Sequence, residues 1–464
     1  MSHVALSMES LVGRMERLPF SGVHKKVFGL SAAGYLFDAY DMALLSFIMP
    51  ALSKDLNLSS IQIGLVFSVS FFGMLVGALL GGTVSDYLGR LKVFKYTLLI
   101  FALGTAATGF VNSYEALLAL RFITGFGLGG EQPVVFTYVS EMVPNQYRGR
   151  LNGLTEAMWG FGMLVAAGIS FLLVPVYGWR SAFFAGILPA CMIWFFRLGI
   201  PESPRWYMIN GRHQEAEEQL ICIEKEVEAE LKHPLPAPKP VEPIYVQEGN
   251  KYSILFRSIY GKRTIMLWLM WFCSLFGYWG LNTWLPTLLK QAGYSMYASI
   301  GYVFIMNLVW VPSGILGSFL SDKIGRKKPI VFYLTCAGIT TLVYGWALAN
   351  KLPLGVMLSC GIAAVLFMAG AFAIIYAYTP ENYPTEVRGT GTGTANSWGR
   401  IGGILAPTVV GVLYPMIGLY LTLAVVAAAF VLAGIAVAAL GMETKGKNLE
   451  ALSDGAKAME KKAG

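Results

Sequence analysis

The sequence predicts an all-α membrane protein with twelve transmembrane helices in two parallel six-helix halves. Three observations carry this prediction: an apolar composition, twelve apolar segments of helix-spanning length, and two loop motifs that each occur twice. Of the 464 residues, 55% are hydrophobic and 13% are charged, and the mean hydropathy is +0.57. Soluble domains carry about 25% charged residues, so the composition argues against a soluble multi-domain enzyme.

Each apolar segment can cross the ~30 Å hydrocarbon layer as a helix, which takes about 20 residues. Six segments precede a polar stretch and six follow it. We expect an N-terminal cytoplasmic segment (1–26), two six-helix halves (27–200 and 263–441), a linker (201–262) and a cytoplasmic tail (442–464). No cleavable signal peptide is evident in the first 26 residues. The apolar segments run 27–50, 61–82, 93–111, 116–141, 152–174, 179–200, 264–289, 298–320, 329–349, 353–378, 390–414 and 417–441.

Lysine and arginine concentrate in the loops that would share one side of the membrane. Because cytoplasmic loops carry the excess of basic residues, both termini are expected in the cytoplasm, and the protein is expected to be a multi-pass protein of the inner (cytoplasmic) membrane. Ten basic residues lie on that side, against four on the other: Arg90, Lys92, Lys95, Arg148, Arg150, Lys323, Arg326, Lys327, Lys328 and Arg388, against Lys54, Arg180, Lys290 and Lys351.

The linker contains a Glu-rich stretch with interspersed Leu, Ile and Val from Gln214 to Leu231, followed by a proline-rich stretch from Pro234 to Pro243. This pattern predicts a short amphipathic helix and an extended connector. A solvated connector is the simpler interpretation, and a surface that docks a partner is the alternative.

Two motifs show that the halves repeat. Asp86-x-x-Gly89-Arg90 recurs 236 positions later as Asp322-x-x-Gly325-Arg326. Glu141, followed by Pro144 and by Arg148-Gly149, recurs 240 positions later as Glu381, Pro384 and Arg388-Gly389. Parallel repeats of this kind place a central site between halves that rock against each other.

Acidic side chains inside apolar segments are the first candidates for function. Asp38 and Asp41 lie three positions apart in the first segment, and Glu131 and Glu156 lie in the fourth and fifth. An ionised carboxylate at mid-membrane costs at least ~2.5 kcal/mol on insertion scales, so such residues usually face the bundle interior and carry function. Simple hydrogen bonding between helices is the alternative. Asp38 and Asp41 are so close together that they resist double ionisation, so we expect one of these two aspartates to be protonated at rest.

Two arginines also lie deep in apolar segments. Arg121 needs an anion nearby, because a buried guanidinium cannot lose its proton; bracing of a glycine-rich helix is the alternative. Arg400 has no basic counterpart in the first half and is suited to planar, bidentate contact with a carboxylate. An internal pair with Glu131 or Glu156 is the alternative for Arg400.

Several kinds of chemistry are disfavoured. The five cysteines show no metal-ligand spacing, the four histidines lie outside the apolar segments, and no nucleotide-binding Gly-x-x-x-x-Gly-Lys-Ser/Thr pattern occurs. No nucleophile–base pair appears in the spans. We therefore expect no metal, no cofactor, no enzyme activity and no nucleic-acid partner.

These residues resemble the major facilitator superfamily from about position 27 to 440. The two doubled motifs and Pro201-Glu202-Ser203-Pro204-Arg205 are similar to the branch of sugar porters and organic-ion transporters. Within that branch, Phe37-Asp38-Ala39-Tyr40-Asp41 and Leu44-Leu45-Ser46-Phe47 look most like bacterial proton-coupled transporters of aromatic monocarboxylates, niacin (nicotinate) transporters in particular.

The resemblance implies roles for these residues. Asp41 and Arg121 match the couple formed in sugar porters, which implies a proton switch that pairs when Asp41 is ionised and separates on protonation. Asp38 departs from the sugar-porter pattern, and its role stays open. The doubled motifs are expected to latch the cytoplasmic side rather than to touch substrate; their residues are Asp86, Arg90, Glu141, Arg148, Asp322, Arg326, Glu381 and Arg388.

The resulting expectation is a symporter that imports a small aromatic monocarboxylate, nicotinate being the first choice. Its partners would be the substrate, protons and the lipid bilayer, and we expect a functional monomer. The alternatives are a proton-coupled sugar or organic-cation porter and a non-transporting receptor of the same fold. The predicted substrate-binding residues are Arg400, Tyr40, Glu131, Trp159, Asn282, Trp284, Tyr376, Asn396 and Trp398; packing is the alternative for each aromatic ring.

Overall fold

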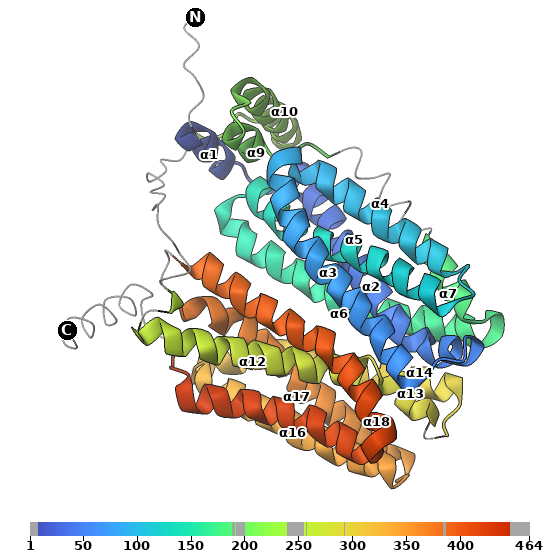
Figure 1. Cartoon of the computed structure of the whole chain (residues 1–464). Coiled ribbons are helices and arrows are strands. Elements are labelled where there is room, and N and C mark those ends of the chain that lie inside the picture. Colours follow the sequence, from blue (N-terminus) through green and yellow to red (C-terminus); the bar gives the residue numbers. More distant parts are fainter. Residues whose placement is uncertain are drawn as a thin grey trace, which may run out of the picture. The chain divides into compact units, whose positions relative to one another are not determined.

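The structure is a computed structural model that describes residues 8–187, 191, 200–238, 255–256, 258–291, 293–383 and 387–445. Every secondary-structure element within these residues is a helix (Figure 1). The side chains of Arg148, Glu156, Asp322 and Arg388 lie outside the described part of the chain. The predictions for these four residues therefore stay predictions.

The helices form two compact units. Unit 1 contains the described residues of Met1–Leu44, Phe72–Ile169 and Val176–Val246, and unit 2 contains those of Leu45–Phe71, Ser170–Pro175 and Gln247–Gly464. Residues 45–71 and 170–175, which the sequence analysis places in the N-terminal half, belong to unit 2 in this division. The predicted domain boundaries stay a prediction.

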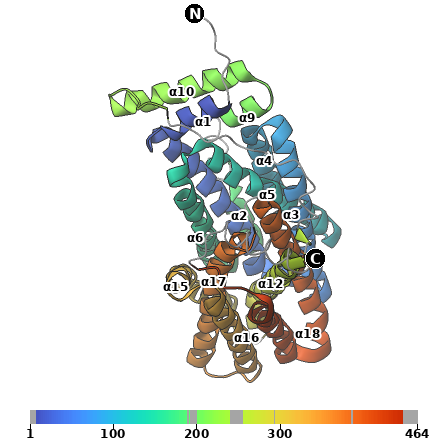
Figure 2. The same cartoon turned by 90° about the vertical axis from the view of Figure 1, so that its left-hand side faces the viewer.

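Unit 1 is built on long helices that continue from one to the next through short connections. They are α2 (Gly22–Asp55), α3 (Ser60–Leu88), α4 (Arg90–Thr108), α5 (Tyr114–Met142), α6 (Asn145–Tyr177) and α7 (Trp179–Ala185), with the ends of α2, α3 and α6 reaching into unit 2. Three shorter helices, α1 (Met8–Glu16), α9 (Pro204–Ile209) and α10 (His213–Leu231), pack together at one end of this bundle (Figures 1 and 2). Helix α10 lies where the sequence predicts an amphipathic helix.

Ion pairs join α10 to the N-terminal helices. Glu224 on α10 accepts hydrogen bonds from Arg14 and Arg17, at 2.6 Å in both closest contacts. Lys26 at the start of α2 contacts Glu226 at 2.7 Å. Beneath these pairs, apolar residues of α1 and α10 form a small core around Leu11 and Leu220. The charged face of α10 that the sequence predicts is therefore partly used to hold the N-terminal segment of unit 1.

Unit 2 contains the second set of long helices. They are α12 (Ser258–Asn282), α13 (Leu285–Gln291), α14 (Met296–Asn307), α15 (Trp310–Ile324), α16 (Lys327–Ala349), α17 (Leu354–Glu381) and α18 (Arg388–Leu440). Helix α18 packs on α12 and α16, and α17 packs on α15 and α16 (Figure 2). The apolar segments predicted at 390–414 and 417–441 both lie on α18, which is interrupted by non-helical backbone at Gly418, with φ 77°.

Glycines let the helices approach closely. A Cβ at Gly129 of α5 would collide with the backbone carbonyl of Met74 on α3, and one at Gly402 of α18 would collide with the carbonyl of Phe272 on α12. Small residues at helix contacts replace the hydrophobic driving force that lipid cannot supply. The glycine-rich stretches of α5 and α18 thus bring the helices that carry Arg121 and Arg400 close to their neighbours.

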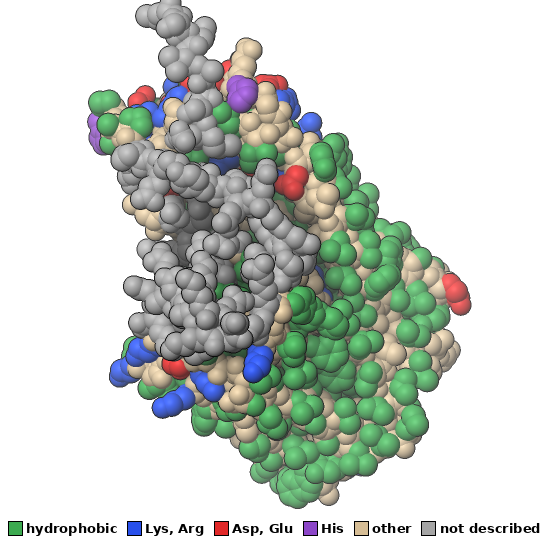
Figure 3. Space-filling view, turned by 60° about the vertical axis from the view of Figure 1, so that its left-hand side comes forward, with side chains coloured by type: hydrophobic (Ala, Val, Ile, Leu, Met, Phe, Trp, Pro, Cys, Tyr) green, Lys and Arg blue, Asp and Glu red, His purple; other side chains and the backbone are tan. Residues whose placement is uncertain are grey.

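Within the described residues, nine helices are long and apolar enough to cross a membrane. One of the nine covers both predicted segments on α18, and the segment predicted at 179–200 is described only in part. Helix α5, which carries the buried Arg121 and Glu131, is not among the nine. Hydrophobic side chains cover most of the surface away from the charged margins in Figure 3. The chain is therefore an all-helical, multi-span membrane protein, and the total of twelve spans stays a prediction.

Candidate functional site

A buried ion pair lies inside unit 1. Arg121 of α5 and Asp41 of α2 each have 1% of their side chain exposed, and Arg121 Nη1 lies 3.3 Å from Asp41 Oδ2. The hydroxyl of Thr105 on α4 donates to the other carboxylate oxygen, Oδ1, at 2.5 Å. The structure thus brings together the two residues that the sequence predicts as a couple.

Neutral groups also hold the guanidinium. Arg121 Nη2 donates to the hydroxyls of Thr108 and Thr124 at 3.0 and 3.2 Å, and the ring of Phe183 lies 5.2 Å from the guanidinium carbon. A buried arginine that loses its only anion is normally very costly. Here two hydroxyls and a ring would still contact it if Asp41 became neutral, so this arrangement is suited to a pair that changes charge.

Two further carboxylates lie in the interior of unit 1. Asp38, one turn before Asp41 on α2, and Glu131 on α5 are both 0% exposed. Tyr40 is also buried, and its hydroxyl donates to the carbonyl of Ala182 at 2.8 Å. Trp159 contacts the ring of Tyr35, with centroids 5.4 Å apart.

In unit 2 the predicted binding residues lie on α12, α17 and α18 and in the turn between α12 and α13. Arg400 is half-buried, and its Nε donates to Asn396 Oδ1, one turn earlier on α18, at 3.3 Å. The ring of Tyr376 stands edge-on to Trp271 at 5.0 Å, and Trp398 lies 5.0 Å from Trp268. Tyr376 and Trp398 remain 45% and 39% exposed.

Two other predicted contacts are used within unit 2. Trp284 is fully buried, and its Nε1 donates to the carbonyl of Pro407 at 3.0 Å. Asn282 donates through Nδ2 to the carbonyl of Tyr278 one turn before it, at 3.0 Å. The contact of Trp284 is one of packing, the alternative stated above for the aromatic rings, and the bond of Asn282 is internal to its helix. Their role in binding stays a prediction.

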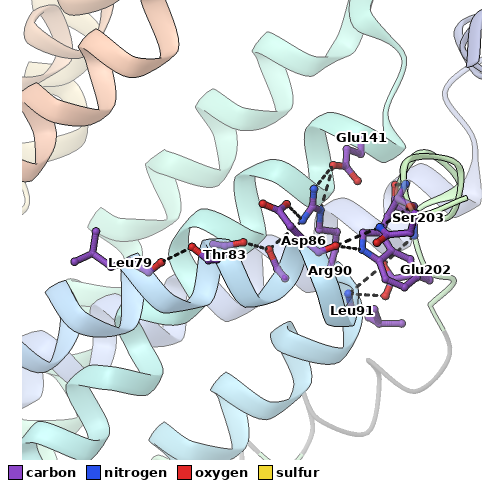
Figure 4. A network of polar contacts seen from close by, with 12 residues as sticks. Leu79, Thr83, Asp86, Arg90, Leu91, Glu141, Glu202 and Ser203 are labelled. Carbon is purple, nitrogen blue, oxygen red and sulfur yellow. Dashed lines mark hydrogen bonds and ion pairs between the residues drawn. The ribbon is translucent and has the colours of Figure 1, made fainter. Parts of the chain in front are cut away.

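The first Asp-x-x-Gly-Arg loop forms a polar network at one end of unit 1, called the loop end below (Figure 4). Arg90 pairs with Asp86 and also contacts Glu141, with Nη2 3.1 Å from Oε1. Glu202 accepts from the backbone N–H of Leu91 at 3.0 and 3.1 Å, which satisfies an open donor at the start of α4. Three parts of the chain thereby meet in one network.

Unit 2 contains a similar network, with different distances between the charged groups. Arg326 Nε lies 3.4 Å from Glu381 Oε1, and Glu443 accepts from the N–H groups of Arg326 and Lys327 at 2.7 and 3.2 Å. Glu443 thus takes the place in unit 2 that Glu202 has in unit 1. Sequence reasoning did not single out Glu443, although Glu443-Thr444 after the last helix parallels Glu202-Ser203 after the sixth. That parallel is the signal that could have found it.

The two capping glutamates differ in pKa. Burial raises the pKa of Glu202 above its usual value, and the N–H groups of Ser203 and Leu91 only partly oppose this. Burial also acts to raise the pKa of Glu443, but its backbone N–H donors, Arg326 foremost, outweigh that effect and lower it. A carboxylate with more donors keeps its charge more easily.

Comparison with known proteins shows which family the chain matches and which proteins it resembles in sequence and in fold. Residues 31–407 match the model of the Major Facilitator Superfamily. The chain is 38% identical to the niacin transporter NiaP of Acinetobacter baylyi, over 95% of this chain and 99% of that protein. It is 37% identical to a putative niacin/nicotinamide transporter of Bacillus subtilis, over 92% and 98%. An inward open structure of the xylose transporter XylE from E. coli matches with a TM-score of 0.76 at 20% identity, covering 93% of this chain and 99% of that one.

Proposed function

Because the chain belongs to the major facilitator superfamily, it is a secondary transporter of a small molecule and not an enzyme, and we propose that it imports nicotinate together with protons. The buried Asp41–Arg121 pair carries the coupling part of this proposal. The relatives named for niacin, at 37% and 38% identity over nearly the whole chain, support the substrate.

In the proposed cycle Asp41 is the group that takes up and releases the proton. When ionised it holds Arg121, and Thr105 stabilises its charge by donating to the carboxylate. When protonated it frees Arg121, which keeps its contacts with Thr108 and Thr124. The two charge states thus differ in how firmly α2 is tied to α5, and a substrate that favours one state shifts the equilibrium between them.

Nicotinate offers a carboxylate and a flat aromatic ring. We assign the carboxylate to Arg400, because a guanidinium fork matches the two oxygens of a carboxylate. Asn396 fixes the Nε edge of that fork. The half-exposed rings of Tyr376 and Trp398 are the candidates for stacking on the pyridine ring. A neutral amide offers no charge to Arg400, which makes nicotinamide the natural comparison.

Uptake of labelled nicotinate into proteoliposomes tests the proposal. With an inward proton gradient, the full-length protein should accumulate nicotinate above its equilibrium level, and collapsing the gradient should abolish the excess. Excess sugar or organic cation should not compete, whereas other pyridine carboxylates should. Binding without accumulation would instead indicate a receptor, and accumulation that ignores the gradient would refute the coupling.

A further inference from the structure

One buried side chain of α12 contacts both helices that carry the proposed binding residues of unit 2. Tyr376 lies on α17, and Trp398 and Arg400 lie on α18. The side chain is that of Trp271, which is 1% exposed. The N–H of a buried indole usually finds a hydrogen-bond acceptor. The contacts of Trp271 therefore show what holds α17 and α18 beside this part of α12.

On the α17 side, Trp271 contacts two residues of one face. Its Nε1 donates to the hydroxyl of Thr379 at 2.9 Å, and its ring stands edge-on to Tyr376 at 5.0 Å. Residues three positions apart share a helix face. The Thr379 hydroxyl itself donates to the carbonyl of Ile375 at 2.8 Å, which leaves its oxygen lone pairs for the indole. Trp271 and Thr379 are at most 1% exposed, so solvent does not compete for their bond.

On the α18 side, Trp271 packs against a glycine. A Cβ at Gly399 would lie 3.2 Å from the carbonyl oxygen of Trp271 and 3.3 Å from its Cβ. Gly399 stands between Trp398 and Arg400 in the chain, and at 3.6 residues per turn each of these neighbours projects about 100° away from it. The contact of Gly399 with Trp271 therefore fixes how α18 presents the two side chains on either side.

A second tryptophan holds Trp398 in a similar way. Trp268, one turn before Trp271 on α12, has its ring 5.0 Å from that of Trp398, and its Nε1 donates to the hydroxyl of Thr394 at 3.4 Å. This bond is longer than the one from Trp271, and Trp268 is only half-buried. Trp271 differs from Trp268 in contacting both α17 and α18, so it is the residue that links the two helices.

The proposed substrate is rigid. The carboxylate of nicotinate is bonded directly to its ring, so the separation of the two groups is fixed. Stacking on Tyr376 and contact with Arg400 at the same time therefore require one separation between these residues of α17 and α18. A ligand with one more CH₂ between ring and carboxylate needs a separation that is longer by about 1.5 Å. Preorganised groups favour the ligand that fits without rearrangement.

We propose that Trp271 is a positioning residue that sets substrate selectivity. By bonding to Thr379 and packing on Gly399, it holds the ring of Tyr376 and the guanidinium of Arg400 at the separation that fits an aromatic acid whose carboxylate is attached directly to the ring. Trp271 acts through these residues and does not touch the substrate. The inference rests on the proposed function and adds what determines its selectivity.

The first test compares binding of nicotinate and of 3-pyridylacetate, which has the additional CH₂, by titration calorimetry on the purified full-length protein. The wild type should bind nicotinate at least about tenfold more tightly. In Trp271→Phe, which keeps a ring and loses the indole N–H, this ratio should fall by about two- to tenfold, the range for one buried hydrogen bond. Trp346→Phe, an indole that is 50% exposed on α16, is the matched control and should keep the ratio.

The second test removes the same bond from its other side. Thr379→Val should lower the ratio as much as W271F does, whereas Thr379→Ser keeps the hydroxyl and should keep the ratio. The double variant W271F/T379V should match the single variants, because one bond can be lost only once. Additive losses, or a T379S protein that behaves like T379V, would refute the bond between Trp271 and Thr379 as the cause.

Thermal midpoints without ligand, measured for the same variants, separate positioning from general destabilisation. A Trp271 that only stabilises the fold would lower the midpoint and weaken the binding of both acids by the same factor, and that result overturns the proposal. If the wild type prefers nicotinate and the ratio stays the same in W271F and T379V, only the role of Trp271 fails. If the wild type binds neither acid, the proposed function fails, and this inference fails with it.

Discussion

The two units treat buried charge in opposite ways. In unit 1, Arg121 and Asp41 are 1% exposed, and three hydroxyl groups complete their contacts. In unit 2, Arg400 is half-buried, and the rings of Tyr376 and Trp398 remain partly exposed. A closed polar interior suits a group that exchanges a proton, and an accessible cation with flat side chains suits an organic anion. Under the proposed function, the two repeats would therefore carry different tasks, proton coupling in unit 1 and substrate binding in unit 2.

The largest expected effect comes from a change in the buried pair of unit 1. Asp41→Asn keeps the shape and removes the charge, so gradient-driven accumulation of nicotinate should fall by at least about a hundredfold. Exchange of labelled for unlabelled nicotinate at equal pH should persist, because Thr108 and Thr124 still hold Arg121. Proteoliposome uptake with and without a gradient measures both. Wild-type accumulation in D41N would remove Asp41 from the coupling.

The next effect tests the unit 2 side. Arg400→Ala should weaken nicotinate binding by about ten- to a hundredfold, the range for a charged hydrogen bond of about 1.5–3 kcal/mol. Binding of neutral nicotinamide should change by less than about threefold. Titration calorimetry on the purified protein gives both constants, and Arg400→Lys separates charge from fork geometry. Equal losses for the two ligands would contradict the carboxylate role.

A smaller effect compares the turns that open α4 and α16. Gly89 and Gly325 have φ values of 108° and 99°, and a Cβ at either would collide with the carboxylate of Glu202 or Glu443. Each change to Ala should destabilise its unit by about 1–3 kcal/mol, seen as a lower thermal midpoint in detergent. Gly82→Ala and Gly355→Ala, where a Cβ meets open space, are the controls. Unchanged midpoints in G89A and G325A would show that the turns relax freely.

The smallest effect compares the two capping glutamates across pH. The lowered pKa of Glu443 means that its contribution to stability is present above the unfolded value of 4.5 and is lost as pH falls through the folded value. The raised pKa of Glu202 has the opposite sign, so its contribution is present below 4.5 and is lost as pH rises.

Glu443→Gln should therefore destabilise the protein at neutral pH, by less than about 1 kcal/mol after solvent screening, and its deficit should shrink in acid. Glu202→Gln resembles the protonated form of Glu202. Its loss of stability relative to the wild type should therefore be smallest at neutral pH and should increase in acid. Thermal midpoints of both variants across the acidic range measure this. Parallel profiles would mean that the two caps are equivalent.

Much of the fold could be read from the order of residues. Apolar segments set the helices, because a membrane helix satisfies its own backbone and needs only length and apolarity. The doubled Asp-x-x-Gly-Arg loops predicted two similar turns, and Gly89 and Gly325 share the positive φ that such turns need. The candidate charges Asp41, Arg121 and Arg400 stood out for the same reason, since a charge in an apolar run is costly.

Only the tertiary structure decided what surrounds those charges. Thr105, Thr108 and Thr124 are ordinary residues in their helices, and they become ligands because glycine contacts bring α4 and α5 together. Trp284 and Tyr40 are buried, and each donates a hydrogen bond to a backbone carbonyl far away in the sequence. The opposite pKa shifts of Glu202 and Glu443 likewise depend on how many backbone donors face each one. A sequence names the costly groups, whereas the partners that stabilise them come from helix packing, where residues far apart in the chain become neighbours.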